Sequence, residues 1–159
     1  TGMGIEIERK FLVINDLWKA GADNGTVFKQ GYLTHAGNSS VRVRKEGEKA
    51  NLNIKSAEMG IQRQEFEYPI PVDEANELLD LFCPRTISKI RYEVNFAGKT
   101  WEIDVFEKEN QGLIVAEIEL QTTDEAFEHP PWVGDEVSAE ARYYNNELAR
   151  HPYSEWEDK

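Results

Sequence analysis

Charged residues alternate with apolar residues along most of this chain, and this period of two restricts the fold more than any other feature of the sequence. Successive side chains of an extended strand point to opposite faces, so each alternating segment predicts a strand with one charged and one apolar face. Eight segments show the pattern: Ile5–Ile14, Val27–Thr34, Ser40–Gly47, Lys49–Ala57, Ile61–Ile70, Thr86–Phe96, Lys99–Lys108 and Gly112–Gln121. Short turns rich in Gly and Asn separate many of them, which predicts antiparallel neighbours.

The charges on these faces are sorted by strand. The bases are Lys10, Arg42, Arg44, Lys55, Arg63, Lys89 and Arg91, and the acids are Glu6, Glu8, Glu65, Glu67, Glu93, Glu102, Asp104, Glu117 and Glu119. For a single strand, the solvated outer face of a sheet is the simpler interpretation. Over seven strands, the sorting favours a closed eight-stranded antiparallel barrel with a charged interior, which makes the fold class mainly β (α+β). On this hypothesis the interior has a net charge of −2, and −10 of the chain's −12 lies elsewhere.

A few helices are expected to cover the apolar outside of the barrel. Asp73 can cap a helix that continues through Phe82 and ends at Pro84. Thr123 can cap a short helix over Asp124–Glu128, and Ser138 can cap a C-terminal helix that ends near Arg150.

Length and composition restrict the class of protein further. The 159 residues predict one domain over 1–159, in which we interpret Thr1 and Gly2 as a cloning remnant ahead of Met3. The single cysteine, Cys83, excludes an intramolecular disulfide. We find neither a signal peptide nor an apolar run long enough to cross a membrane, which predicts a cytoplasmic protein. The net charge of −12 predicts binding to neither nucleic acid nor membrane.

The residue types of the charged faces indicate a chemistry. Carboxylates that cluster without His or Cys suit hard cations such as Mg²⁺ or Mn²⁺. Inward Arg and Lys side chains suit phosphate oxygens. Bases that hold a polyphosphate beside acids that hold its metal ion are the parts required for phosphoryl transfer or hydrolysis.

Several motifs resemble those of the CYTH proteins, also called triphosphate tunnel metalloenzymes. The first is the ExExK sequence at Glu6–Lys10, which is a weak motif by itself. The later matches, in the same order along the chain, are Lys29–Thr34, Val41–Arg44, Ile54–Ser56, Lys89–Tyr92, Glu102–Phe106 and Glu117–Glu119. The resemblance covers Met3 to about Leu148, and Pro130–Gly134 followed by Arg142–Tyr143 is similar to the short bacterial inorganic triphosphatase branch.

The resemblance implies a role for each matching residue. The metal ligands would be Glu6, Glu8, Asp104, Glu117 and Glu119, holding two ions of Mg²⁺ or Mn²⁺. The triphosphate would be bound by Lys10, Arg42, Arg44, Lys55, Arg63, Lys89 and Arg91. Lys10 and Tyr32 would form a catalytic pair, whereas Glu65, Glu67 and Glu102 match the pattern without a definite role.

The expected activity is metal-dependent hydrolysis of a small-molecule triphosphate, in the first place inorganic tripolyphosphate, by attack of a metal-activated water. Three alternatives stay open: a thiamine or nucleoside triphosphatase, an adenylyl cyclase of the class IV type, and a polyphosphate-binding module without turnover. The cyclase is disfavoured because Met3–Ile5 stands where those members have a His-Phe dipeptide. The preferred metal, the physiological role and the oligomeric state, a homodimer included, are left open by the sequence.

Overall fold

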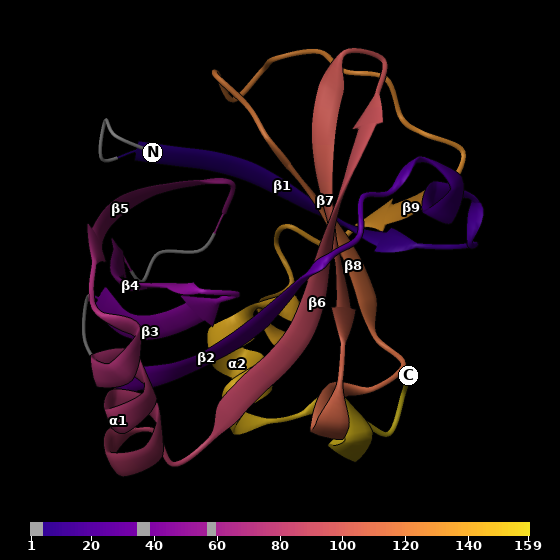
Figure 1. Cartoon of the computed structure of the whole chain (residues 1–159). Helices are drawn as coiled ribbons and strands as arrows, with labels where there is room; N and C mark the ends of the chain where they lie inside the picture. The colour runs from indigo at the N-terminus through magenta and orange to yellow at the C-terminus, as the bar shows by residue number, and fades with distance from the viewer. Residues whose placement is uncertain (1–4, 35–38, 57–59) are drawn as a thin grey trace.

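The computed structural model describes residues 5–34, 39–56 and 60–159, and within them nine strands form one antiparallel sheet. The strands are β1 (Ile5–Val13), β2 (Thr26–Thr34), β3 (Ser39–Glu46), β4 (Lys49–Ser56), β5 (Gln62–Pro69), β6 (Thr86–Phe96), β7 (Lys99–Phe106), β8 (Ile114–Glu119) and β9 (Val133–Glu136). Eight of them follow the order β5-β4-β3-β2-β6-β7-β8-β1, and β1 pairs with β5 to close the sheet into a barrel (Figure 1). The predicted barrel is therefore confirmed.

Each of the eight predicted strands is present, with ends that differ by a few residues. The segment predicted as Thr86–Phe96 has the same bounds in the structure, and the last one shortens from Gly112–Gln121 to Ile114–Glu119. Ala57, the predicted end of the fourth strand, and the turn over 36–38 lie outside the described residues.

The apolar faces of the strands point outward and form three clusters beneath the covering segments. One cluster centres on Phe11, Trp101 and Ile118, which pack with Trp18 and Trp132 from the connections around them. A second cluster packs β6, β7 and β8 against the C-terminal segment, and a third packs β3 and β4 against helix α1 (Val72–Phe82). The hydrophobic core thus surrounds the barrel, and the interior is left mostly to polar side chains.

The short helices differ from the predictions in three places. Helix α1 begins one residue before Asp73, with Pro71 at its N-cap, so Asp73 lies in the first turn. The predicted helix over Asp124–Glu128 is wrong, because this segment forms turns and irregular backbone. Five residues ahead of two prolines are too few to offset the cost of helix nucleation. Instead, Glu125 accepts a hydrogen bond from the Gln121 amide and pairs with Lys99.

The predicted C-terminal helix from Ser138 is also wrong in its first half. A 3₁₀ turn, η3 (Ala141–Tyr143), is followed by the extended residue Tyr144 and then by helix α2 (Asn145–Arg150). Ser138 does not cap a helix, since its hydroxyl accepts a hydrogen bond from the Lys10 amide at 2.9 Å. The backbone therefore bends where this segment contacts β1, and Figure 1 shows α2 packed beside the lower ends of β2 and β6.

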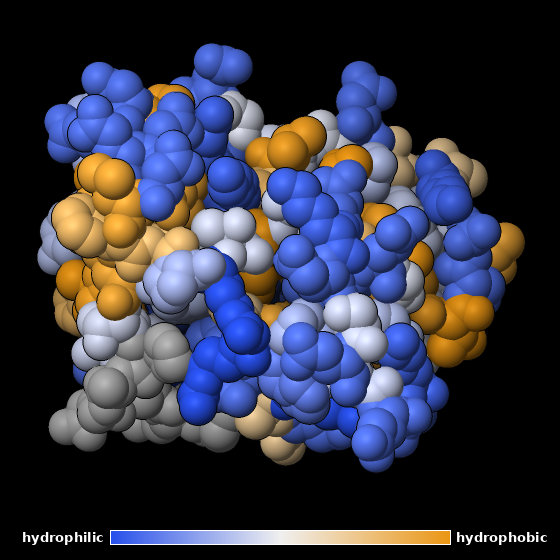
Figure 2. Space-filling model, turned by 90° about the horizontal axis from the view of Figure 1, so that it is seen from below, coloured by the Kyte–Doolittle hydropathy of each residue, from blue (hydrophilic) through white to orange (hydrophobic). Residues whose placement is uncertain are grey.

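The remaining elements are short. They are the 3₁₀ turns η1 (Leu17–Gly21), η2 (Lys108–Asn110) and η4 (Tyr153–Glu155), and strand β9, which adds to the outer edge of β1. The surface on the α1 side carries an apolar area (Figure 2), where Leu81 and Phe82 of α1 are exposed. Among the described residues, no helix combines the length and the apolar character needed to cross a bilayer.

Candidate active site

The barrel encloses a cavity of about 230 Å³ whose walls are almost entirely polar. All seven predicted phosphate-binding residues line it, as do Tyr32 and four of the five predicted metal ligands. The charged lining residues are Glu6, Glu8, Lys10, Arg42, Arg44, Lys55, Arg63, Glu65, Glu67, Lys89, Arg91, Glu102, Glu117 and Glu119. They comprise seven bases and seven acids, so the described wall of the cavity is neutral overall.

Two acids assigned to the interior by sequence parity do not line the cavity. Glu93 is exposed, because β6 and β7 continue as a hairpin beyond the barrel (Figure 1), and that prediction is wrong. Asp104 does point inward, but it is only 1% exposed and lies behind the bases that cover it.

Three carboxylates meet on neighbouring strands. Glu8 of β1, Glu117 of β8 and Glu102 of β7 each place a carboxylate oxygen within 4.8 Å of the other two. The register causes this, since Glu117 lies directly opposite Glu102 and diagonally opposite Glu8, two residue pairs along the β1–β8 ladder. The family resemblance predicted Glu8 and Glu117 as ligands but gave Glu102 no definite role.

The electrostatics of this cluster suit a divalent cation. Burial raises the pKa of Glu8 well above its usual value, and the charges of Glu117 and Glu6 raise it further. Burial also raises the pKa of Glu102, more strongly than Arg91 lowers it. A hard divalent cation takes carboxylate oxygens and would relieve this repulsion, so the donor set fits Mg²⁺ or Mn²⁺.

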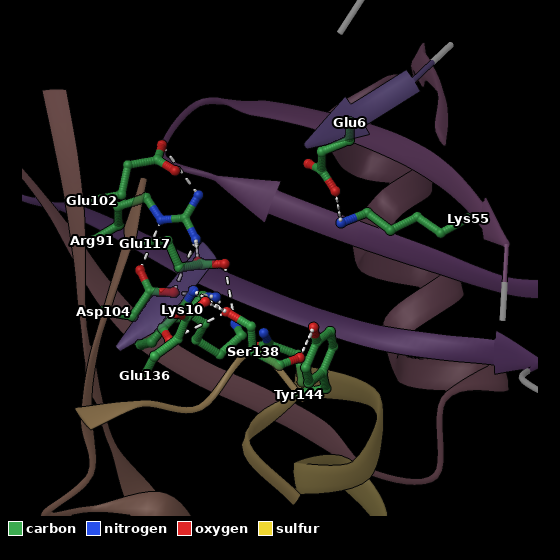
Figure 3. A network of polar contacts seen from close by, with 12 residues as sticks. Glu6, Lys10, Lys55, Arg91, Glu102, Asp104, Glu117, Glu136, Ser138 and Tyr144 are labelled. Atoms are coloured by element: carbon green, nitrogen blue, oxygen red, sulfur yellow. Dashed lines mark hydrogen bonds and ion pairs between the residues drawn. The ribbon is translucent and has the colours of Figure 1, made fainter. Parts of the chain in front are cut away.

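Glu117 is the charged centre of the network in Figure 3. It accepts hydrogen bonds from the Lys10 ammonium at 3.0 Å and from the Arg91 guanidinium at 2.9 Å. Burial would raise the pKa of Glu117, but Lys10, a hydrogen bond from Glu8 and Arg91 hold it well below its usual range. Glu117 is therefore ionised beside a Glu8 that holds its proton more tightly.

Asp104 has both carboxylate oxygens occupied by bases. Lys89 donates to Oδ2 at 2.7 Å, and Arg91 donates to Oδ1 at 2.7 Å and to Oδ2 at 2.9 Å. Burial lowers the pKa of Lys89 to about 8, although Asp104 opposes this change. The side chain of Asp104 thus orients two of the predicted phosphate ligands, and its predicted contact with a metal ion stays a prediction.

Glu6 and Glu119 occupy other positions along the cavity. Lys55 bridges Glu6 at 3.0 Å and Glu65 at 3.4 Å. In Figure 3 the ion pair of Lys55 and Glu6 lies apart from the network around Glu117. Glu119 lies directly opposite Glu8 in the β1–β8 register but is exposed at the edge of the cavity. Their metal-binding roles also stay predictions.

Three arginines of the cavity have no carboxylate of the described residues at hydrogen-bonding distance. No acidic oxygen of the described residues lies within 4.0 Å of Arg42 or Arg63, and Arg44 reaches Glu46 only at 3.8 Å. The Nε atoms of Arg42 and Arg44 are buried without a hydrogen-bond partner in the described part of the chain. Burial, and then the charges of Arg42 and Arg91, lower the pKa of Arg44 to about 10. Arg42 and Arg44 are therefore desolvated and repel each other, and an anion would relieve both costs.

The sequence missed the contribution of the C-terminal segment to the site. Tyr144, Asn145 and Asn146 line the cavity, and Asn145 accepts a hydrogen bond from Lys89 at 3.1 Å. The ammonium of Lys10, predicted to pair with Tyr32, lies 5.0 Å from the centre of the Tyr144 ring. These residues reach the site because the backbone bends at Tyr144, between η3 and α2, and no sequence motif predicted this bend.

The fold and the cavity define a class: a closed antiparallel barrel whose interior combines clustered carboxylates with anion-binding bases. Comparison with known proteins specifies the family, since a CYTH domain matches residues 4–153. This chain belongs to the CYTH family.

Two curated relatives match nearly the whole chain. An inorganic triphosphatase from Acetivibrio thermocellus is 45% identical over 98% of this chain and 100% of its own length. An inorganic triphosphatase from Nitrosomonas europaea is 37% identical over 91% of this chain and 96% of its own length. The crystal structure of an inorganic triphosphatase, 34% identical, superposes with a TM-score of 0.66 and covers 91% of this chain and 93% of the other.

Proposed function

We propose that this protein is an inorganic triphosphatase that hydrolyses tripolyphosphate with the help of Mg²⁺ or Mn²⁺. One observation carries the proposal: a single cavity holds three arginines without a hydrogen-bonded carboxylate among the described residues and, on neighbouring strands, a cluster of three carboxylates. A polyanion and the cations that accompany it require both sets together. The names of the relatives that match over nearly the whole chain support the same activity.

The bases of the cavity would bind the substrate. Arg42, Arg44 and Arg63 can each donate two hydrogen bonds to phosphate oxygens, while Lys55, Lys89 and Arg91 add charge from the remaining wall. Burial lowers the pKa of Lys10, but Glu117 and Glu8 outweigh it and raise the pKa to about 12. In the metal-free protein Lys10 is therefore protonated at neutral pH, and in this form it can stabilise negative charge on the substrate.

Glu8, Glu102 and Glu117 would hold one divalent cation. When bound, such a cation withdraws charge from phosphate oxygens and lowers the pKa of a water molecule that it binds. For a second ion, we propose the remaining predicted ligands Glu6, Asp104 and Glu119. Tyr32 lines the same cavity and is proposed to act with Lys10.

We also propose that the substrate is a free small molecule of the cytoplasm. Outside the cavity acids outnumber bases, since the chain has 30 Asp and Glu against 18 Lys and Arg. Nucleic acid and anionic membranes are therefore unfavourable partners.

Phosphate release from a panel of tripolyphosphate, pyrophosphate, ATP and thiamine triphosphate, each with Mg²⁺ or Mn²⁺, tests the function. We expect the highest kcat/KM for tripolyphosphate and no release in the presence of a chelator. Absence of release from every substrate would contradict the proposal and favour a binding module. Conversion of ATP to cyclic AMP would favour a cyclase.

The substitution Arg42→Ala tests whether the substrate binds in the cavity. We expect kcat/KM for tripolyphosphate to fall about ten-fold or more, as the loss of one charge-assisted hydrogen bond implies. Arg150→Ala is the matched control, because Arg150 is exposed on α2 and pairs only with Glu147 among the described acids. Equal activities of the two variants would place the substrate elsewhere.

A further inference from the structure

The interior of the barrel contains a phenylalanine that is surrounded by cations. Phe28 of β2 is 4% exposed. The guanidinium carbons of Arg91 and Arg44 lie 4.9 Å and 5.1 Å from the centre of its ring, and the Lys89 ammonium lies at 5.8 Å. All three distances are within the range of cation–π attraction.

Strand register produces this arrangement. Lys89 of β6 lies directly opposite Phe28. Arg91 of β6 and Arg44 of β3 each lie two residues from the position opposite Phe28, on the same inward face. Side chains directly and diagonally opposite on one face of a sheet are close enough to interact. The ring of Phe28 thus contacts three predicted phosphate ligands.

Tyr144 forms a similar arrangement at the C-terminal segment. Its ring is 5.0 Å from the Lys10 ammonium and 4.9 Å from the guanidinium carbon of Arg63. Its hydroxyl donates to the Ser138 carbonyl at 2.7 Å, with the Gly60 carbonyl also near at 3.2 Å (Figure 3 shows the Tyr144 side chain). Tyr144 is 7% exposed, so these contacts are shielded from bulk water.

An aromatic face differs from a carboxylate as a partner for a buried cation. A carboxylate neutralises the cation and competes with phosphate, as Glu117 does for Lys10. The face of a ring attracts the cation through its quadrupole, carries no net charge and leaves the N–H donors of the cation free to bind an anion. A ring can therefore order like-charged side chains before the substrate arrives.

We propose that Phe28 and Tyr144 are positioning residues, whose rings orient Arg44 and Arg63, two bases without a hydrogen-bonded carboxylate among the described residues, toward the phosphate oxygens. Phe28 also packs beside Lys89 and Arg91, which Asp104 holds, and Tyr144 packs beside Lys10, which Glu117 holds. The proposal rests on the proposed function, because the bases are oriented for a triphosphate. Neither ring needs to contact the reacting atoms.

A fluorinated series at Phe28 is the sharpest test. Replacement of Phe28 by mono-, di- and trifluorophenylalanine changes the side-chain volume little but weakens the negative face of the ring stepwise. We expect log kcat/KM for tripolyphosphate to fall with each fluorine, reaching a loss of about ten-fold, while the melting temperature stays nearly constant. A packing role alone would give no such trend.

Leucine variants provide a second readout. Phe28→Leu keeps an apolar side chain but removes the ring, and we expect KM for tripolyphosphate to rise about ten-fold. Phe11→Leu is the matched control, since Phe11 is equally buried but packs in the outer cluster. We expect it to lower the melting temperature to a similar extent with kcat and KM close to wild type.

Two variants of Tyr144 separate the contribution of the ring from that of the hydroxyl. Tyr144→Phe keeps the aromatic face, and we expect it to retain most of the activity, whereas Tyr144→Leu should lose as much as Phe28→Leu. Equal losses in both variants would mean that the hydroxyl contacts act and the ring does not, which would overturn the proposal for Tyr144.

The two proposals fail in different ways. If the wild type hydrolyses tripolyphosphate but the fluorinated series is flat, the positioning role of Phe28 is overturned and the function stands. If the wild type is inactive, the function fails, and calorimetric titration of tripolyphosphate into the same series still measures whether affinity follows the ring electrostatics. A flat affinity series would then overturn the positioning role.

Discussion

At the scale of single residues, the position of a carboxylate along the barrel decides its role. Glu102 and Glu93 lie directly opposite each other on β7 and β6, yet Glu102 belongs to the carboxylate cluster and Glu93 is exposed. The pair therefore offers a matched test of the metal site.

We expect Glu102→Gln to raise the Mg²⁺ or Mn²⁺ concentration needed for half-maximal activity about ten-fold or more, because the cluster loses one of its three anionic donors. Glu93→Gln should leave the metal dependence unchanged. The measurement is the initial rate against metal concentration, with circular dichroism to check folding. Identical curves for the two variants would mean that the cluster does not hold the activating ion.

The raised pKa of Glu8 predicts that the stability of the metal-free protein depends on pH. Its pKa in the folded state is well above the ordinary value of 4.5, since burial and then Glu117 and Glu6 disfavour its charge. Below pH 4.5 Glu8 is protonated in both the folded and the unfolded state and costs nothing. Above it the unfolded chain ionises first, so stability falls as the pH rises toward the folded pKa.

In a chelator, Glu8→Gln should therefore melt at a higher temperature than wild type at pH 8, and the difference should shrink toward pH 4. Addition of Mg²⁺ at pH 8 should stabilise wild type more than the variant. Thermal melts over this pH range check both statements. A variant that is less stable than wild type at pH 8 without metal would show that the charge of Glu8 is already compensated.

At the scale of elements, the C-terminal end of α1 packs tightly against the barrel wall at Gly31 of β2. A Cβ atom added at Gly31 would lie 2.7 Å from Cys83 Cβ, 2.9 Å from Cys83 Sγ and 3.1 Å from Leu79 Cδ2. These contacts are shorter than packing allows, so Gly31 sets how closely the end of α1 can approach the barrel.

We expect Gly31→Ala to lower the free energy of unfolding by about 1–3 kcal/mol, the usual cost of overpacking. Gly21→Ala is the control, because a Cβ there meets its nearest neighbour, Val94, at 3.6 Å. Urea unfolding measures both. If the double variant with Cys83→Gly, which lacks both the Cβ and the Sγ atom of Cys83, does not recover part of the loss, the contact with Cys83 is not its cause.

At the scale of the whole molecule, charge is divided between the cavity and the surface. Seven of the 18 bases line the cavity beside an equal number of acids, and the acids dominate the rest of the chain. The large anions that could contact the surface are therefore repelled, while a small one can reach the bases inside.

This division predicts that double-stranded DNA does not bind at an ionic strength of ~0.15 M. Fluorescence anisotropy of a short labelled duplex, titrated with protein, measures it. The same titration with added tripolyphosphate is the control for any signal that arises from the cavity. Tight binding of the duplex would mean that the bases are accessible from outside.

The sequence by itself determined the strands, the closed barrel and the inward direction of its charges. Alternation is a local property, so Arg42 and Arg44, or Glu6 and Glu8, necessarily share a strand face. The family motifs added a prediction of the kind of ligand that such a face binds. All seven predicted bases reached the cavity for this reason.

Only the tertiary structure decided which of these side chains meet. Parity places a residue inside or outside but does not say how far along the barrel it lies, which depends on register and strand length. Glu93 therefore fell beyond the barrel, and Glu102 joined Glu8 and Glu117. Tyr144 reaches Lys10 and Arg63 because an irregular segment packs across β1, and no local pattern encodes a contact between residues so distant in the chain.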